Sequence, residues 1–257
     1  LNGEPASPLI NKVIQQAFTL LGKTAIGINL SVHSAIPIKA GLGSSASFCV
    51  CLIRLLSDYF DISMTKLQVQ DQAHQLEHIF HGTPSGLDTW VVSQEKIIHF
   101  RKGEAPKYLA QKAIKRQGKS YPWRFVLIDS GQRSSTKHIV KKLASFFQDH
   151  KDSTLIDQFS QLSQVAQKGF ESGDITLVQK SIHSYYELLK NQKEYLTPKL
   201  SEIITISLDL GILAAKPTGS GGGGYVIGLL DPEVYQNQLT ILEKKFGKKN
   251  ILPVTLS

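Results

Sequence analysis

The feature that most constrains this chain is a glycine- and serine-rich segment at residues 36–47, which reads IPIKAGLGSSAS. Before it, residues 26–33 alternate apolar and polar side chains, as a half-buried β-strand does. After it, residues 47–60 are largely apolar with few charges, which predicts a helix buried nearly all round. We therefore expect the chain to run here as strand, glycine turn and helix.

Such a turn is suited to hold an anion. The start of a helix presents free backbone N–H groups and the positive end of the helix dipole, both of which favour a phosphate. Gly41 and Gly43 permit close approach, and the hydroxyls of Ser44, Ser45 and Ser47 can cap the helix or bind phosphate or metal. No Gly-Lys-Ser/Thr closes the loop, so the pattern is not a P-loop. An ordinary glycine turn with serine caps is the competing interpretation.

Two later glycine-containing stretches give the first one a context. Residues 81–88 read HGTPSGLD and residues 216–224 read KPTGSGGGG. Together with residues 37–47, and in this order, they resemble the three signatures of the GHMP small-molecule kinases, the family of galactokinase, homoserine kinase, mevalonate kinase and phosphomevalonate kinase. Three motifs in the right order make coincidence a poor explanation.

The resemblance implies an α+β fold of two domains, with ATP and substrate between them. Residues 1–120 would form the N-terminal ATP-binding domain, similar to domain 2 of ribosomal protein S5 but lacking its first strands. Residues 121–257 would form a ferredoxin-like α/β sandwich. In this family a longer segment with a Pro-Gly-Lys-like stretch precedes the phosphate motif, and nothing in residues 1–30 matches it. Because the chain begins with a leucine and holds one methionine, we expect either that it is a fragment or a trimmed chain or that this half of the site is missing.

The family pattern also assigns roles to individual residues. It makes Asp88 the base that takes the hydroxyl proton, and it gives Ser45 and Glu77 to Mg²⁺, a hard cation that favours oxygen ligands. On the substrate side it implies Ser85, Gly86, Thr136, Gly219, Ser220, Gly221 and Gly222. The ATP phosphates would lie on Lys39, Ala40, Gly41, Leu42, Gly43, Ser44, Ser45, Ala46 and Ser47.

Each role has a structural alternative. Glu77 could be an exposed helix charge, and Asp88 or Thr136 could be a helix cap. The glycine run could be a flexible linker, although the apolar strand expected at residues 225–230 argues against that.

The resemblance is strongest toward the mevalonate kinases, since a Ser-Thr-Lys follows the strand expected at residues 124–129. It implies ATP-dependent transfer of the γ-phosphate to a primary hydroxyl, that of mevalonate to give 5-phosphomevalonate in isoprenoid biosynthesis. Phosphomevalonate kinase or another GHMP kinase is the first alternative. A catalytically silent binding protein with the same fold is the second.

A different class is suggested by His74, Glu77 and His78, which fit the H-x-x-E-H spelling of inverted zinc peptidases. The two histidines are four residues apart and would share a helix face. No third ligand is evident at helical spacing downstream, and a zinc hydrolase would leave all three glycine motifs unexplained.

Charge and composition limit the kinds of partner that the protein is expected to bind. The net charge is +8, but the basic residues are spread out with little aromatic interleaving, so we expect a small-molecule substrate and no nucleic acid. No 18-residue apolar run indicates a membrane span, and no signal peptide is evident at residue 1. Cys49 and Cys51 should point to different sides of a helix, so we expect no disulfide and a cytoplasmic location. A homodimer is possible.

The rest of the sequence predicts helices and strands that support the fold. Helices are expected at residues 8–21, 65–81, 134–147, 155–170, 175–195, 200–215 and 232–246, and strands at 97–100, 124–129, 225–230 and 251–256. The helix at 65–81 should begin with a capping box of Thr65 and Gln68.

Overall fold

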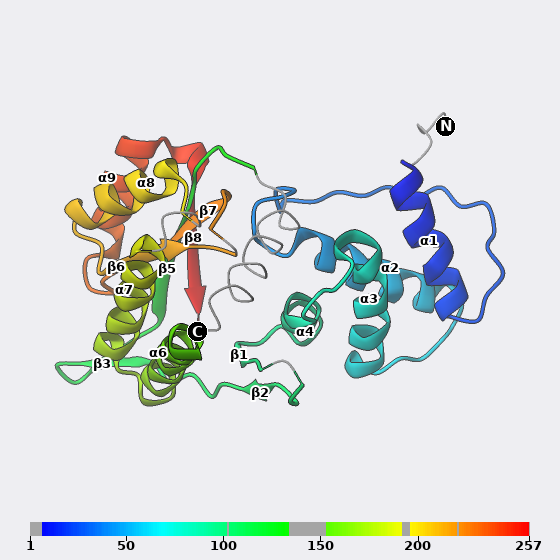
Figure 1. Ribbon diagram of the computed structural model, residues 1–257, viewed down its shortest axis with the longest axis horizontal. Coiled ribbons are helices and arrows are strands. Elements are labelled where there is room, and N and C mark those ends of the chain that lie inside the picture. The colour runs from blue at the N-terminus through cyan, green and yellow to red at the C-terminus, as the bar shows by residue number, and fades with distance from the viewer. Residues whose placement is uncertain (1–6, 102, 134–152, 192–195, 220, 257) are drawn as a thin grey trace. The chain divides into compact units, whose positions relative to one another are not determined.

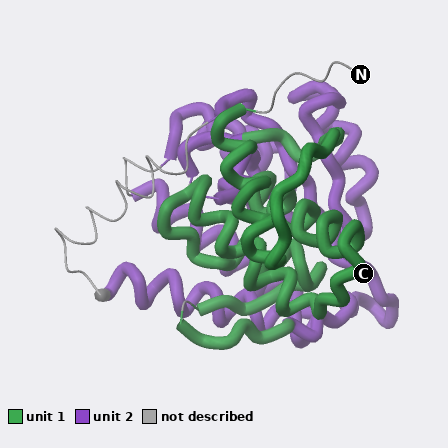
Figure 2. Tube along the Cα trace, turned by 90° about the vertical axis from the view of Figure 1, so that its right-hand side faces the viewer, with its two compact units in different colours: residues 1–38, 43–108 green, residues 39–42, 109–257 purple. Residues whose placement is uncertain are grey.

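The computed structural model describes residues 7–101, 103–133, 153–191, 196–219 and 221–256 (Figure 1). By its contacts the chain forms two compact units (Figure 2). Unit 1 comprises residues 1–38 and 43–108, and unit 2 comprises residues 39–42 and 109–257. The domains expected at residues 1–120 and 121–257 stay a prediction.

Unit 1 is built mainly of helices: α1 (Pro8–Leu20), α2 (Ser44–Tyr59), α3 (Lys66–His81) and α4 (Leu87–Gln94). A short antiparallel pair, β1 (Ile98–His99) and β2 (Lys107–Tyr108), follows them. The first three helices bury one shared core, formed by Val13, Ala17, Phe18, Cys49, Val50, Leu52, Ile53, Leu56, Val69, Ala73 and Leu76. The expected helices at 8–21 and 65–81 and the expected strand at 97–100 are confirmed in kind.

The capping box at the start of α3 is also confirmed. The backbone N–H of Gln68 donates to the Thr65 hydroxyl at 3.2 Å, and the Thr65 N–H donates to the Gln68 side-chain oxygen at 2.8 Å. These bonds satisfy two donors at the helix start that would otherwise lack partners.

The strand expected at residues 26–33 is wrong. This segment has no strand assignment, and no described strand pairs with it. Ile28 and Leu30 pack against the core of unit 1, whereas Ile26 and Val32 are exposed. The alternation of side chains therefore reports burial correctly only for Ile28 and Leu30. A strand also needs a partner for its backbone groups.

Helix α2 differs from its prediction in two ways. It begins at Ser44 rather than at residue 47, and it is not buried all round, since Leu55 and Tyr59 are exposed. The core contacts only one side of the helix, and the apolar residues on the other side face solvent. Cys49 is buried and Cys51 is exposed, and neither forms a disulfide, as expected.

Unit 2 contains a four-stranded antiparallel sheet in the order β6-β7-β5-β8. Its strands are β5 (Trp123–Asp129), β6 (Ala214–Pro217), β7 (Tyr225–Leu229) and β8 (Ile251–Leu256), and a separate hairpin joins β3 (Ile114–Arg116) to β4 (Lys119–Tyr121). Helices connect β5 to β6 and β7 to β8. This is the ferredoxin-like order, so that expectation is confirmed.

Helices cover both faces of this sheet. Val126 and Ile128 of β5 pack with residues of α8 (Pro198–Asp209) and α9 (Tyr235–Phe246). Trp123 and Phe125, which alternate with them along β5, pack on the other face with α7 (Ile175–Asn191). Helix α6 (Ser153–Ser172) lies against α7, and a short 3-10 turn, η1 (Lys248–Asn250), precedes β8.

One predicted helix of unit 2 needs correction. The helix expected at residues 200–215 ends at Asp209, and a strand, β6, occupies the last part of that range. The chain turns at Gly211, whose φ of 90° is unfavourable for other residues, well before Pro217. The helix expected at 134–147 lies outside the described residues. Within the described parts of the chain, no helix has both the length and the apolar character needed to cross a bilayer.

Candidate functional site

The turn that the sequence predicts to bind an anion lies at the start of α2. Gly43 is the N-cap of the helix with φ of 67°, and Gly41 and Lys39 also have positive φ, at 70° and 59°. Among the described residues no side chain caps this helix, so the serines do not take the capping role that was one of their expected functions. The first backbone N–H groups of α2 are therefore left for another acceptor, which a phosphate would supply.

The first half of this turn lies against the C-terminal glycine motif, within unit 2. The Thr218 hydroxyl donates to the Tyr225 carbonyl at 3.1 Å and lies 3.5 Å from the Ala40 carbonyl. A Cβ atom on Gly41 would come within 3.3 Å of the Thr218 hydroxyl, and one on Gly224 would overlap the Ala40 carbonyl. Glycine is required at residue 224 because backbone passes against backbone there.

The glycine motif is also tied to the end of β5. The Ser130 hydroxyl donates to the Gly224 carbonyl at 2.6 Å, and the Gly224 N–H donates to the Gln132 carbonyl at 2.8 Å. These bonds, with the strand that follows at Tyr225, show that the motif is not a flexible linker. Residues 218–224 are therefore held at the edge of a folded sheet, apart from Ser220, which lies outside the described residues.

In unit 1, α3 brings a buried carboxylate to the start of α2. Glu77 is 3% exposed, so it is not the solvated helix charge that was its alternative interpretation. Its Oε2 lies 4.0 Å from Nε2 of His81, and that nitrogen lies 2.9 Å from the hydroxyl of Ser45. The Oε1 of Glu77 is buried and has no hydrogen-bond partner among the described residues.

The electrostatics of Glu77 follow from this burial. Burial raises the pKa of the Glu77 carboxyl, while the hydrogen bond from Ser45 and positive charge on His81 oppose that shift. A buried carboxylate oxygen without a partner is costly unless a cation or a proton joins it. The donor set of a carboxylate and a neighbouring hydroxyl therefore fits Mg²⁺, which takes few protein ligands and keeps waters or phosphate oxygens.

The carboxyl of Asp88 lies close to the N-cap of α2. Asp88 is the second residue of α4, whose N-cap is Gly86 with φ of 90°. A Cβ atom on Gly43 would be 3.7 Å from Cγ of Asp88. Surrounding protein raises the pKa of the Asp88 carboxyl and positive charge on His81 opposes this, although the residue keeps an exposed surface that moderates the shift. Asp88 is not the N-cap of its helix, which was its alternative role.

The turn that presents Asp88 is ordered by local bonds. The Ser85 hydroxyl accepts from the Leu87 N–H at 3.2 Å, and the Thr89 hydroxyl donates to the Gly86 carbonyl at 3.0 Å. Gly86 is buried against the ring of His74, which a Cβ atom would meet at 3.4 Å. Ser85 and Gly86 thus shape the turn before Asp88.

The residues named from the sequence fall into two sets. Unit 1 holds Gly43, Ser44, Ser45, Ala46, Ser47, Glu77, Ser85, Gly86 and Asp88, and unit 2 holds Lys39, Ala40, Gly41, Leu42, Gly219, Gly221 and Gly222. Thr136 and Ser220 lie outside the described residues. Sequence reasoning gave His81 no role, although its position four residues after Glu77 places both on one helix face.

The zinc-hydrolase pattern is not assembled as a metal site. His78 contacts the Gly82 carbonyl through Nδ1 at 2.6 Å, and the His74 ring lies against Gly86. In the part of the chain that the structure describes, no group of three histidine, cysteine or acidic residues is arranged to hold a metal ion. The match of His74, Glu77 and His78 to the H-x-x-E-H pattern therefore does not correspond to a zinc site in the described residues.

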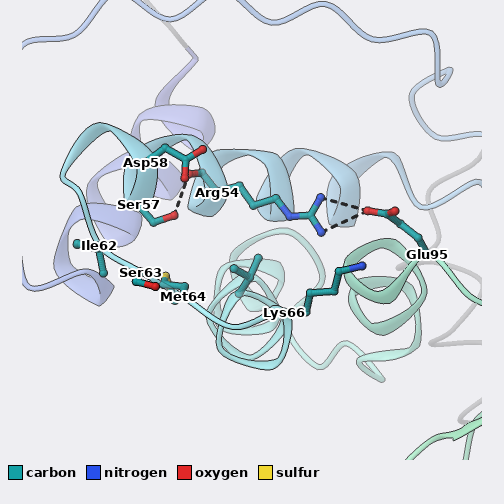
Figure 3. A pocket seen from close by; sticks show the side chains of 9 residues that line it. Arg54, Ser57, Asp58, Ile62, Ser63, Met64, Lys66 and Glu95 are labelled. Atoms are coloured by element: carbon teal, nitrogen blue, oxygen red, sulfur yellow. Dashed lines mark hydrogen bonds and ion pairs between the residues drawn. The ribbon is translucent and has the colours of Figure 1, made fainter.

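A separate surface hollow of about 450 Å³ lies in unit 1 and shares no residue with the candidate site. Figure 3 shows the Arg54 guanidinium directed at the Glu95 carboxylate in this hollow, at 3.4 Å. Arg54 also donates to the Ser93 carbonyl at 3.0 Å. Arg54 and Glu95 are paired with each other, and the hollow contains no residue of the three glycine motifs, so we do not place the chemistry there.

Comparison with known proteins gives these features a family context. Residues 9–93 match the model of the GHMP kinases N terminal domain, and residues 166–247 match that of the GHMP kinases C terminal. The chain is 30% identical over 251 residues to mevalonate kinase ERG12 of Gibberella zeae, covering 86% of this chain and 47% of that protein. It is 27% identical over 230 residues to mevalonate kinase of Pyrococcus furiosus, and this match covers 86% of this chain and 64% of that protein. The chain thus spans about half to two-thirds of the length of these relatives.

Solved structures resemble it as well. The crystal structure of L. major mevalonate kinase in complex with R-mevalonate superposes with a TM-score of 0.78 at 22% identity, covering 97% of this chain and 76% of that one. Phosphomevalonate kinase of Streptococcus pneumoniae, in complex with phosphomevalonate and AMPPNP, superposes with a TM-score of 0.76 at 15% identity. The match covers 98% of this chain and 83% of that one. At these identities the likeness concerns the fold.

Proposed function

The chain belongs to the GHMP kinase family, and from this premise we propose that it transfers the γ-phosphate of ATP to a primary hydroxyl of a small molecule. The observation that carries the proposal is the position of Asp88, whose carboxyl lies against Gly43 at the N-terminus of α2. A base beside an anion-binding helix start is what phosphoryl transfer to an alcohol requires.

The mechanism uses few groups. The substrate hydroxyl oxygen attacks the γ-phosphorus, its proton passes to Asp88, and the bond to the β-phosphate oxygen breaks to release ADP. The surrounding protein raises the pKa of the Asp88 carboxyl toward the pH at which the reaction runs. A general base is most effective when its pKa lies near that pH. The N–H groups at the start of α2 and the backbone of residues 39–43 would hold the phosphates in place.

Ser45 and Glu77 are the residues that would hold Mg²⁺, and their fit rests on the buried, unpartnered Oε1 of Glu77. Bound there, the ion would neutralise charge on the β- and γ-phosphates. The substrate-side roles of Gly219, Ser220, Gly221 and Gly222 stay a prediction. Two free cysteines fit a cytoplasmic location, and the homodimer stays a prediction.

Mevalonate is the acceptor we propose, to give 5-phosphomevalonate in isoprenoid biosynthesis. The relatives with 27–30% identity are mevalonate kinases, whereas phosphomevalonate kinase is similar at 15% identity. The alternatives are phosphomevalonate or another alcohol as acceptor, and a binding protein without catalysis.

The test measures ADP release with mevalonate, phosphomevalonate, homoserine and galactose, on this chain and on any longer product of its gene. Replacing the base in Asp88→Asn should lower kcat by about 10² to 10⁴-fold, the usual contribution of a general base. Asp71→Asn, an exposed acid on α3, is the matched control and should keep full activity. Turnover with another acceptor alone would exclude mevalonate, and ATP binding without any turnover would favour the binding protein.

A further inference from the structure

His81 is the last residue of α3, and it contacts a residue at the start of a different helix. Its Nε2 lies 2.9 Å from the Ser45 hydroxyl, across a separation of 36 residues in the chain. The same nitrogen is 4.0 Å from Oε2 of Glu77, which is too long for a hydrogen bond. His81 is therefore bonded to Ser45 and is only a neighbour of Glu77.

This bond decides where the lone pairs of the hydroxyl point. A serine hydroxyl has one proton and two lone pairs, and a neutral imidazole nitrogen can accept the proton. Without a cation, the Ser45 hydroxyl can also direct its single proton to the Glu77 carboxylate. With a cation beside Glu77, that proton would be directed to His81, and the lone pairs of Ser45 would face the cation together with the carboxylate. Residues behind the ligands of a metal commonly fix ligand orientation in this way.

We propose that His81 is a positioning residue that orients the Ser45 hydroxyl toward the cation site shared with Glu77. The proposal deepens the function above and rests on its assignment of the metal to Ser45 and Glu77. His81 itself contacts neither phosphate nor acceptor in this scheme, and it orients the metal ligand through its bond to the Ser45 hydroxyl.

A purely structural role accounts for the contact less well. Helices α2 and α3 already pack through a shared core that includes Cys49, Ile53, Ala73 and Leu76, all of them 0% exposed. The His81 side chain is 34% exposed, and a single hydrogen bond at that degree of exposure adds little to such packing. The bond is thus better explained by what it does to the hydroxyl.

The experiment measures binding of Mn²⁺, used as the probe for Mg²⁺, by electron paramagnetic resonance with a non-hydrolysable ATP analogue present. His81→Leu should weaken Mn²⁺ binding by about 10- to 100-fold, the effect typical of losing such a supporting contact. The affinity for metal-free nucleotide should be unchanged. His81→Gln, whose amide can reach the same hydroxyl, should recover part of the loss. In the kinase assay the loss should fall on kcat and on the metal requirement, not on the KM of the alcohol.

Two further variants separate the mechanism from a general disturbance. In a Ser45→Ala background His81→Leu should add no further loss, because it acts through that hydroxyl. His78→Leu, in the same last turn of α3, should bind Mn²⁺ like the wild type. Wild-type affinity in His81→Leu, or a full additional loss in the Ser45→Ala background, would overturn the proposal alone. Absence of nucleotide-dependent Mn²⁺ binding in the wild type would overturn both this proposal and the metal assignment beneath it.

Discussion

At the scale of single residues, the chain places glycine where neighbouring backbone leaves no room for a side chain. Gly173, between α6 and α7, is buried with φ of 76°, and a Cβ atom there would overlap the Ala113 carbonyl. Gly118, in the β3–β4 turn, has the same φ of 76° but nothing within 4 Å. Comparing Gly173 with Gly118 therefore separates the energetic cost of the left-handed backbone conformation from the cost of a steric clash with a Cβ atom.

We therefore predict that Gly173→Ala destabilises unit 2 more than Gly118→Ala does. Both variants carry the cost of a left-handed conformation, about 1–2 kcal/mol. Gly173→Ala carries in addition the cost of overpacking, about 1–3 kcal/mol. Urea unfolding followed by fluorescence of the buried Trp123 would measure the difference. Equal midpoints for the two variants would show that the backbone at Ala113 shifts freely.

At the scale of elements, α3 carries residues of the candidate site at its C-terminal end and a stabilising capping box at its N-terminal end. The capping box at Thr65 begins the helix, and Glu77 and His81 lie in its last turns. At 1.5 Å per residue the two ends are about 20 Å apart. Stability and metal binding should thus respond to different changes in this helix.

Removing the cap in Thr65→Ala should lower the free energy of unfolding by about 1 kcal/mol, because the Gln68 N–H loses its acceptor. Well below the unfolding temperature, kcat and Mn²⁺ affinity should stay as in the wild type. Thr240→Ala, an exposed threonine within α9, is the control and should change stability little. A fall in Mn²⁺ affinity of folded Thr65→Ala would contradict the separation of roles along α3.

At the scale of the whole molecule, the two units have separate hydrophobic cores. The core of unit 1 contains Leu76, and that of unit 2 contains Leu200, both 0% exposed. The chain passes from unit 2 to unit 1 between Leu42 and Gly43, inside the glycine turn that we propose binds phosphate. Both units therefore contribute backbone to one short motif.

We predict that Leu76→Ala and Leu200→Ala each weaken chiefly their own unit. The loss for each variant should be about 2–5 kcal/mol, typical of a buried leucine truncated to alanine. Hydrogen exchange read by mass spectrometry would report peptides of both units in each variant, so each serves as the control for the other. Equal loss of protection in both units in either variant would mean that the molecule unfolds as one cooperative body.

The family was predictable because its signals are local. The glycine turn before α2, the turn before Asp88 and the glycine run are short motifs whose order along the chain indicated the family. The capping box at Thr65 and the opposite orientations of Cys49 and Cys51 follow from helix geometry alone. Local hydrogen bonds and the period of a helix depend on residues a few positions apart, which a sequence shows directly.

The sequence by itself thus determined most of the described helices and the family, and it named the residues that we propose carry the chemistry. Only the tertiary structure decided that residues 26–33 pair with no described strand, that β6 follows α8, and that His81 bonds to Ser45. It also decided that Glu77 is buried and that residues 39–42 lie against the C-terminal glycine motif. Strand pairing, burial and side-chain contacts join residues far apart in the chain, so no local pattern contains them.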